Sequence, residues 1–138
     1  MFVHGDFSTA NILYWPEDNR LAIIDWSPSD WLAGGVGTLG PRYADMTILL
    51  QSLFTSRPFG PHPIRERDKL GRVFLDAYAE HTNGDVRLDE FGEYSEALLA
   101  VFLTQRRKQM GLRFLAYQPS FGQLRQFVRR FCLQGRMR

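Results

Sequence analysis

Two hydrophobic patterns follow each other along the chain. Near the N-terminus, two short apolar runs, ILYW after Asn11 and LAII before Asp25, flank a polar turn at 16–20 that contains Pro and Asn. Apolar runs of this length around a short polar turn predict a β-hairpin. The segment 27–42 that follows is rich in Gly, Pro and Ser, which is typical of an irregular loop.

Helical patterns dominate the remaining residues. The mostly apolar segment 43–54 predicts a buried helix, and the PFGPHP segment at 58–63 interrupts the chain. Within 64–82 an apolar stripe recurs at helical spacing, and Asn83–Gly84 provides a C-terminal cap. The stripe consists of Leu70, Val73, Phe74, Ala77 and Tyr78.

Two further helices complete the pattern. One begins at Asp89 and has its acids in the first turns and its bases at the end, as the helix dipole favours. Pro119 and Ser120 open the other, whose apolar residues repeat at i, i+3, i+4 and i+7. The apolar positions are Phe91, Tyr94, Leu98, Val101 and Phe102 in the first helix, and Leu124, Phe127, Val128 and Phe131 in the second. We therefore predict an α+β, mostly helical fold: a hairpin followed by about four helices, in one domain spanning 1–138.

Composition agrees with this architecture. The 138 residues are 44% hydrophobic and 23% charged, which is ordinary for a soluble globular protein with one core. No apolar run approaches the roughly 18–20 residues of a membrane span, and no secretory signal is visible. The single cysteine, Cys132, excludes an internal disulfide and a cysteine zinc cluster. These observations favour a cytoplasmic protein.

Charge is distributed unevenly along the chain. Residues 1–56 include two basic and six acidic residues, whereas 57–138 include fifteen basic and nine acidic ones, and no acid follows Glu96. A basic segment of this kind attracts nucleic acid or another polyanion, and a solvated helix face is the alternative explanation. We favour the solvated face, so nucleic acid is not an expected partner.

Polar residues near the N-terminus carry the candidate chemistry. His4, Asp6 and Asn11 lie in the stretch HGDFSTAN, and the predicted hairpin brings Asp25 back beside them. Phosphoryl transfer needs a carboxylate that accepts or orients the proton of an attacking hydroxyl, and hard oxygen ligands that hold Mg²⁺ against the phosphates. A single Asp or Asn in a loop is commonly a turn former or a cap. The ordered combination of these residues with a hairpin favours a site.

The stretch HGDFSTANIL…IIDW resembles the catalytic loop and metal-binding segment of the aminoglycoside phosphotransferase/choline kinase family, the small-molecule branch of the kinase-like fold. The stretch GPRYADMTILL is similar to the helix that follows in that family. These motifs cover residues 3–50, and beyond them only the helical character agrees. The resemblance implies the C-terminal lobe of an ATP-dependent phosphotransferase, with ATP as co-substrate and Mg²⁺ as cofactor.

The resemblance also implies a role for each matching residue. Asp6 would be the catalytic base, Asn11 and Asp25 the Mg²⁺ ligands, and His4 a structural residue of the loop. Asp45 would brace the loop by accepting hydrogen bonds from its backbone N–H groups. We therefore expect the side-chain oxygens of Asn11 and Asp25 to lie roughly 4–5 Å apart. We also expect Asp45 to be largely buried.

Other chemistry-bearing features do not indicate a site. The GVGTLG stretch at 35–40 fits GxGxxG, but no strand precedes it and Pro41 follows it, so it indicates neither a dinucleotide fold nor a phosphate loop. We interpret it as a flexible segment near the substrate cleft. Cys132 lies on the apolar stripe of the last helix and is expected in the core. His62 and His81 have no matching ligand set.

In the family, an N-terminal lobe provides a strand Lys and a helix Glu that hold the nucleotide. Here His4 follows only three residues, and Lys69 and Lys108 come too late to supply that Lys. We expect the chain to be a C-lobe fragment that is inactive alone and exposes an apolar patch where the missing lobe would dock. A stand-alone remnant is the alternative.

The basic C-terminal residues bear on the substrate. A segment without acids would repel a polycationic aminoglycoside, so a small neutral or anionic hydroxylated metabolite fits better. No membrane partner is expected. Two alternatives remain open: a non-catalytic kinase-like remnant that binds a partner, and a helical module that binds polyanions through its basic C-terminus.

Overall fold

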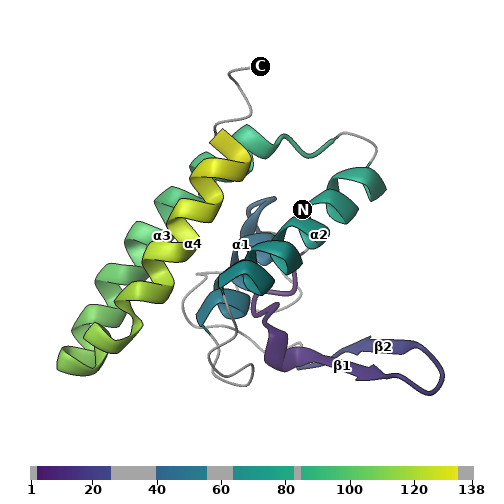
Figure 1. The fold of residues 1–138 in the computed structure, drawn as a ribbon, viewed down its shortest axis with the longest axis horizontal. Coiled ribbons are helices and arrows are strands. Elements are labelled where there is room, and N and C mark those ends of the chain that lie inside the picture. The colour runs from purple at the N-terminus through teal and green to yellow at the C-terminus, as the bar shows by residue number, and fades with distance from the viewer. Residues whose placement is uncertain (1–2, 26–39, 56–63, 83–84, 134–138) are drawn as a thin grey trace. The chain divides into compact units, whose positions relative to one another are not determined.

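The computed structural model describes residues 3–25, 40–55, 64–82 and 85–133, which form a mostly helical chain with one small antiparallel sheet (Figure 1). This confirms the predicted α+β, mostly helical class. The predicted loop at 27–42 lies largely outside the described residues, as do the break at 58–63 and the cap at Asn83–Gly84. The elements are, in order, η1 (Thr9–Asn11), β1 (Ile12–Trp15), β2 (Arg20–Ile23), α1 (Ala44–Thr55), α2 (Ile64–His81), α3 (Leu88–Met110), η3 (Gly111–Tyr117), α4 (Gln118–Val128) and η4 (Arg129–Leu133).

Contacts divide the chain into two compact units, Met1–Leu53 and Phe54–Arg138. The first unit holds the N-terminal loop, the hairpin and most of α1. The second holds α2, α3 and α4 with their connecting turns. The assignment of 1–138 to a single domain stays a prediction.

The β-hairpin forms where the two apolar runs predict it. β1 and β2 pair antiparallel, with Trp15 opposite Arg20. In the turn between them, Asn19 has φ +49, a conformation that Asn tolerates better than most residues. Its side-chain oxygen accepts a hydrogen bond from the Tyr14 hydroxyl at 3.1 Å. The Arg20 guanidinium lies 4.6 Å from the centre of the Trp15 ring, so a cation–π contact closes the end of the hairpin.

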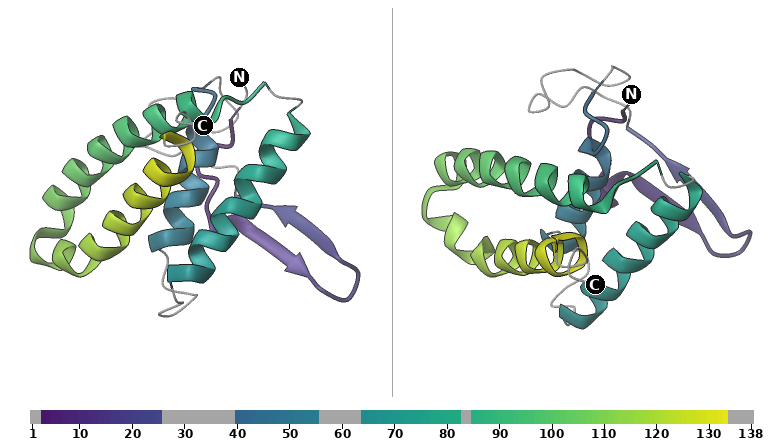
Figure 2. Two further views of the ribbon diagram at one scale, coloured as in Figure 1. Left: turned by 45° about the horizontal axis from the view of Figure 1, so that its top comes forward. Right: turned by 90° about the horizontal axis from the view of Figure 1, so that it is seen from above.

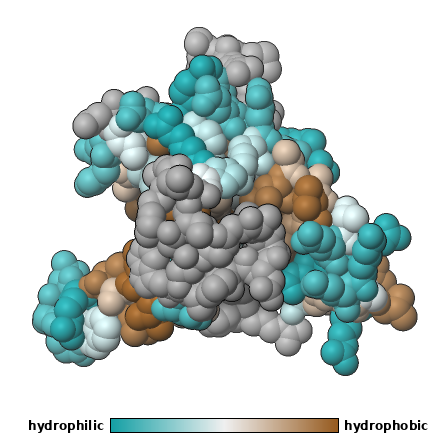
Figure 3. All heavy atoms as spheres, turned by 180° about the vertical axis from the view of Figure 1, so that it is seen from behind, coloured by the Kyte–Doolittle hydropathy of each residue, from teal (hydrophilic) through white to brown (hydrophobic). Residues whose placement is uncertain are grey.

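One face of the hairpin is apolar and open to solvent. The register places Tyr14 opposite Leu21 and Ile12 opposite Ile23, so these four side chains share a face. Tyr14 and Leu21 are 57% and 58% exposed, and Figure 3 shows apolar atoms on the surface of the hairpin. A two-stranded hairpin is marginally stable by itself, so this exposed face is a notable feature of the first unit.

Helix α1 is buried on nearly every side, which confirms the prediction for 43–54. Met46, Ile48 and Leu50 are all almost inaccessible to solvent. The segment before the helix approaches the N-terminal loop closely: a Cβ atom on Gly40 would lie 2.5 Å from a methyl group of Val3. A larger residue at position 40 would push the loop away from α1.

The buried face of α2 differs from the predicted stripe. Leu70 and Val73 are 48% and 59% exposed, whereas Gly71 and Leu75 are buried. A Cβ atom on Gly71 would lie 2.8 Å from the Phe127 ring, so the glycine admits this ring against the backbone of α2. This close contact turns Gly71 and Leu75 inward and leaves Leu70 and Val73 in solvent.

Helices α3 and α4 run side by side in opposite directions and are joined by η3 (Figure 2). Phe121 of α4 packs against Phe102 of α3 and Phe114 of η3, with ring centroids 5.6 and 5.9 Å apart. Val101 is 54% exposed and Leu99 is buried, so the inward face of α3 is turned slightly from the prediction. None of the described helices is long and apolar enough to cross a bilayer.

An ion-pair cluster joins the two helices of this hairpin. Glu96 accepts hydrogen bonds from Arg125 at 2.8 Å and from Arg129 at 2.7 Å. Burial alone raises the pKa of Glu96, but the hydrogen bonds and charges of the two arginines outweigh it, so the pKa lies below its usual value. Arg130 donates to Asp68 of α2 at 2.8 Å. Three basic residues of the C-terminal segment thus have acidic partners.

Candidate functional site

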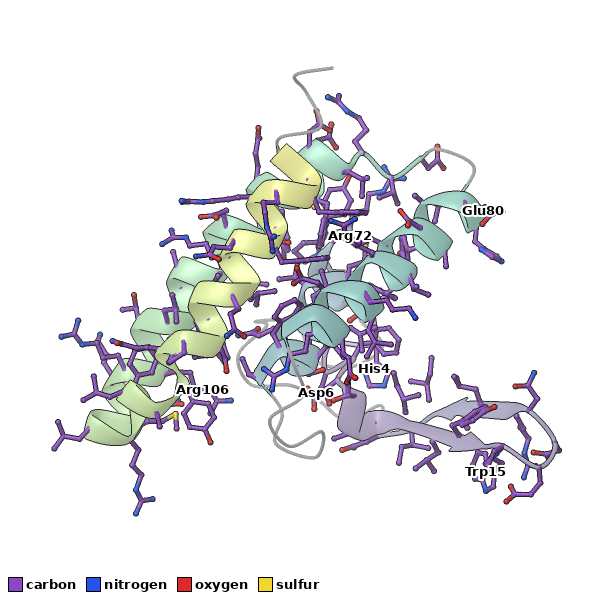
Figure 4. All side chains as sticks on the ribbon, viewed as in Figure 1. His4, Asp6, Trp15, Arg72, Glu80 and Arg106 are labelled. Atoms are coloured by element: carbon purple, nitrogen blue, oxygen red, sulfur yellow. The ribbon has the colours of Figure 1, made fainter. Side chains whose placement is uncertain are left out.

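The candidate site lies in the loop 4–11 that leads into β1. His4 and Asp6 lie at the base of the hairpin, and Trp15 lies towards its far end (Figure 4). Between the first two residues, Gly5 has φ +86. Residues with a side chain rarely adopt this conformation. The glycine therefore allows the sharp turn that separates the two polar side chains.

Asp45, in the first turn of α1, binds the backbone of this loop. Its Oδ2 accepts the His4 N–H at 2.7 Å and its Oδ1 accepts the Gly5 N–H at 2.9 Å. Both are short, charge-assisted hydrogen bonds, and they are the contacts that the resemblance implies for this residue. Asp45 is half-buried rather than largely buried, because it lies at the end of α1.

The ring of His4 uses both nitrogens within the loop and the hairpin. Nδ1 lies 3.2 Å from the Asp6 backbone nitrogen, which donates to it, and Nε2 lies 3.0 Å from the Ile24 carbonyl oxygen. Since a carbonyl only accepts and a backbone N–H only donates, these partners select the tautomer with hydrogen on Nε2. His4 is 4% exposed. Its two ring contacts therefore position it to hold the loop.

Ser52 also binds the loop, and the sequence did not lead us to predict this contact. Its Oγ accepts the Thr9 N–H at 2.8 Å and donates to the Leu49 carbonyl at 2.9 Å. Ser52 follows Asp45 by seven residues, so both lie on the same face of α1. The i and i+7 spacing of these two polar residues on one face of a mostly apolar helix was the available signal.

Asn11 orients Asp6. Its Nδ2 donates to the Asp6 backbone oxygen at 2.9 Å and lies 3.3 Å from Asp6 Oδ2. Because a carbonyl and a carboxylate both accept, the amide nitrogen faces Asp6 and Oδ1 faces away. Asn11 is 8% exposed, and Oδ1 accepts no hydrogen bond from any described residue. This oxygen is therefore available as a ligand.

Asp25 directly follows a residue that the loop holds on both sides. The Ile24 N–H donates to the Asn11 carbonyl at 2.9 Å, and the Ile24 carbonyl faces His4 Nε2. Asp25 itself is exposed and has φ +57, a left-handed conformation that Asp, like Asn, adopts more often than most residues. The 4–5 Å separation expected between the oxygens of Asn11 and Asp25 stays a prediction.

The side chains of Asn11 and Asp25, the two residues expected to bind Mg²⁺, offer oxygen atoms, which suit that ion. Within the parts of the chain that the structure describes, no group of three or more His, Cys, Asp or Glu residues could hold a metal ion. Mg²⁺ is commonly bound by one or two protein ligands together with substrate phosphates and water. The donor set therefore fits a Mg²⁺ ion shared with a phosphate and does not form a cage of protein ligands alone.

The remaining candidates have ordinary structural explanations. Cys132 is 3% exposed, and burial raises the pKa of its thiol to about 12. It is a core residue, as predicted, and not a nucleophile. His81 contacts the carbonyl of Ala77 one turn earlier in α2. His62 and most of the 35–40 stretch lie outside the described residues.

Comparisons with protein-family profiles, curated proteins and solved structures found no match to this chain.

Proposed function

We propose that this chain carries the catalytic loop of an ATP-dependent phosphotransferase that acts on a hydroxyl group of a small molecule. One observation carries the proposal: the Asp45 carboxylate accepts the N–H groups of both His4 and Gly5. A carboxylate that binds two successive N–H groups holds the backbone on either side of a tight turn. That turn leads directly into Asp6, so α1 positions the proposed catalytic base.

Each proposed role is the one that the family resemblance implies, and the hydrogen bonds of the loop support it for Asp6 and Asn11. The Asp6 carboxylate lies 3.3 Å from Asn11 Nδ2 and the Asp6 backbone N–H donates to the His4 ring. The carboxylate would accept the proton of the attacking hydroxyl. Asn11 Oδ1 and the Asp25 carboxylate would hold Mg²⁺. When bound there, the ion would neutralise negative charge on the phosphates of ATP. The preformed hydrogen bonds of Asp6 and Asn11 keep these two residues in place before substrate arrives.

The exposed apolar face of the hairpin gives separate support. Tyr14, Leu21 and Ile23 lie together on a surface that a two-stranded sheet cannot cover by itself. This is the kind of surface we expect if a nucleotide-binding lobe docks there in the active enzyme. The acceptor that fits best is a small neutral or anionic hydroxylated metabolite, since the C-terminal segment is basic.

A matched series of Asp→Asn variants tests the proposed site. Asp25→Asn removes one ligand charge and tolerates the positive φ, Asp6→Asn removes the base, and Asp18→Asn changes an exposed carboxylate of the hairpin turn as the control. Mn²⁺ serves as a spectroscopic probe for Mg²⁺, and its binding is measured by electron paramagnetic resonance with and without ATP.

The proposal makes distinct predictions for the three variants. Mn²⁺ affinity falls by about tenfold or more in Asp25→Asn and stays within about twofold in Asp18→Asn. Any transfer of phosphate from radiolabelled ATP to a pool of hydroxylated metabolites disappears in Asp6→Asn, which retains its Mn²⁺ affinity. Equal Mn²⁺ affinities in all three variants would exclude the metal site, and transfer that survives Asp6→Asn would exclude the proposed base.

A further inference from the structure

The turn between α3 and α4 exposes two leucines on one side. Leu112 is 86% exposed and Leu115 is 57% exposed, and both lie in η3. η3 is a 3₁₀-helix, in which residues three apart lie directly above one another. The two leucines therefore form one apolar ridge at the end of the helical hairpin.

Residues on the inward side of the turn hold this apolar ridge in place. Phe114, on a different side of the 3₁₀-helix, is 6% exposed and stacks on Phe121 of α4 at 5.9 Å. Gly111 ends α3 with φ +53, and its N–H donates to the Arg107 carbonyl. The inward residues anchor the turn, so the exposed leucines already have a defined position. Little conformational entropy is therefore lost when they bind a partner.

Cations surround this ridge. Arg106, Arg107 and Lys108 occupy the last turns of α3, Arg113 lies between the two leucines, and all four are exposed. Figure 4 shows Arg106 on α3 near this end of the hairpin, and its guanidinium lies 5.0 Å from the centre of the Phe102 ring. None of the four forms an ion pair with a residue in the described parts of the chain.

Three arginines of α4 and η4 behave differently. Arg125 and Arg129 pair with Glu96, and Arg130 pairs with Asp68. Two carboxylates thus pair with these three arginines, whereas none of the four cations beside the leucines has an acidic partner in the described parts of the chain. This contrast distinguishes the turn between α3 and α4 from the basic surface formed by α4 and η4. We call Leu112, Leu115 and these four cations the basic tip.

Several occupants of the basic tip can be compared by their chemistry. A second copy of the same surface would repel it, since no acid follows Glu96 in the chain. Single-stranded nucleic acid binds through exposed aromatic rings, but Phe114 is turned inward. An anionic bilayer accepts protruding leucines at the acyl boundary and attracts cations beside them.

We propose that the basic tip docks on the surface of a membrane that contains anionic phospholipids. Leu112 and Leu115 insert at the boundary between headgroups and acyl chains, and the four cations contact the headgroup phosphates and carboxylates. The interaction is peripheral, in keeping with the absence of a spanning segment among the described helices. It departs from the expectation that the chain has no membrane partner, because the exposure of the two leucines is visible only in the structure.

Vesicle co-sedimentation of the full chain tests this proposal. The probes are phosphatidylcholine vesicles with and without about one-third phosphatidylserine, at low ionic strength and at about 0.5 M salt. The apolar variant is Leu112→Ser with Leu115→Ser, and its matched control is Val73→Ser, which changes an exposed apolar residue of α2. The charge variant is Lys108→Gln with Arg113→Gln, and its control is Lys69→Gln, an exposed cation of α2. Circular dichroism verifies that every variant retains its helices.

The expected pattern is specific to the basic tip. The chain binds the anionic vesicles and not the neutral ones, and high salt weakens binding strongly. The double leucine variant binds about tenfold more weakly or worse, and each cation removed costs about fivefold, while both controls bind like the original chain. No binding to anionic vesicles, or equal binding by the leucine variant, would overturn the proposal. Tight binding of RNA or an acidic peptide through the same residues, without vesicle binding, would also overturn it.

Discussion

Replacing Asp45 by Ala removes the acceptor of two backbone N–H groups at once. His4 N and Gly5 N then lose partners at 2.7 and 2.9 Å. The two donors are adjacent in a tight turn, so no small rotation of the loop offers both of them a new acceptor. The substitution therefore tests how strongly α1 holds the candidate catalytic loop.

The magnitude follows from the number and kind of bonds lost. A hydrogen bond to a charged group contributes about 1.5–3 kcal/mol to the free energy of unfolding. Asp45 is half-buried, so water can reach one side of the carboxylate and replace part of this contribution. We expect a loss of about 2–3 kcal/mol for Asp45→Ala. Asp45→Asn keeps one acceptor oxygen but places an amide N–H against the second donor, so a loss of about 1–2 kcal/mol is expected.

Urea denaturation can follow each unit of the chain separately. All three tryptophans, Trp15, Trp26 and Trp31, belong to the first unit, so tryptophan fluorescence reports the unit that contains Asp45. Far-ultraviolet circular dichroism mainly reports α2, α3 and α4 of the second unit. The fluorescence transition should move to lower urea in Asp45→Ala. Asp76→Ala, which removes an exposed carboxylate from α2, serves as the control and should leave it in place.

A fluorescence midpoint in Asp45→Ala that matches the original chain would refute the reasoning. So would an equal shift in Asp76→Ala, because the effect would then come from net charge rather than from the two hydrogen bonds. A loss of about 0.5 kcal/mol or less would mean that water satisfies the two N–H groups without cost.

Three further outcomes are expected. Gly5→Ala should destabilise the first unit by about 1–2 kcal/mol because Gly5 has φ +86, whereas Gly122→Ala, which meets nothing within 4 Å, should be neutral or stabilising in urea denaturation. Cys132 should react with a thiol reagent at pH 8 only under denaturing conditions, because its pKa is raised to about 12 by burial. Folding lowers the pKa of Glu96, so the ionised carboxylate stabilises the fold above its ordinary pKa of 4.5, and this stabilisation is lost as the pH falls through the lower folded pKa. Glu96→Gln should therefore flatten the dependence of stability on pH in acid denaturation curves.

Local signals in the sequence were sufficient for the hairpin and for α1. Apolar runs around a polar turn specify antiparallel pairing without help from distant residues, and the observed register joins Trp15 to Arg20 across that turn. The contact of Asp45 with the loop was expected from the family resemblance and not from a local rule. It is physically reasonable because a carboxylate in a mostly apolar helix needs partners, and the loop provides backbone donors.

The buried face of α2 could not be predicted because it depends on a distant partner. A prediction from periodicity considers only where the apolar residues lie, and on that basis Leu70 and Val73 belong to the buried stripe of the helix. In the structure the absence of a side chain at Gly71 lets the Phe127 ring pack against the helix, which turns the helix about its axis. No local rule identifies a glycine as the centre of a contact. The exposure of Leu112 escaped prediction similarly, since it depends on the anchoring of Phe114.

The anchors of the candidate loop act on the backbone rather than on side chains. The N–H groups of His4 and Gly5 bind Asp45, that of Asp6 binds the His4 ring, and that of Thr9 binds Ser52. Backbone donors are present whatever the side chain is, so these bonds constrain the spacing of the loop more than its composition. A short sequence motif is defined by such spacing, here the number of residues from His4 to Asp6 and from Asp6 to Asn11. This explains why a few residues near the N-terminus could indicate the geometry of the loop, whereas the packing of the second unit required the structure.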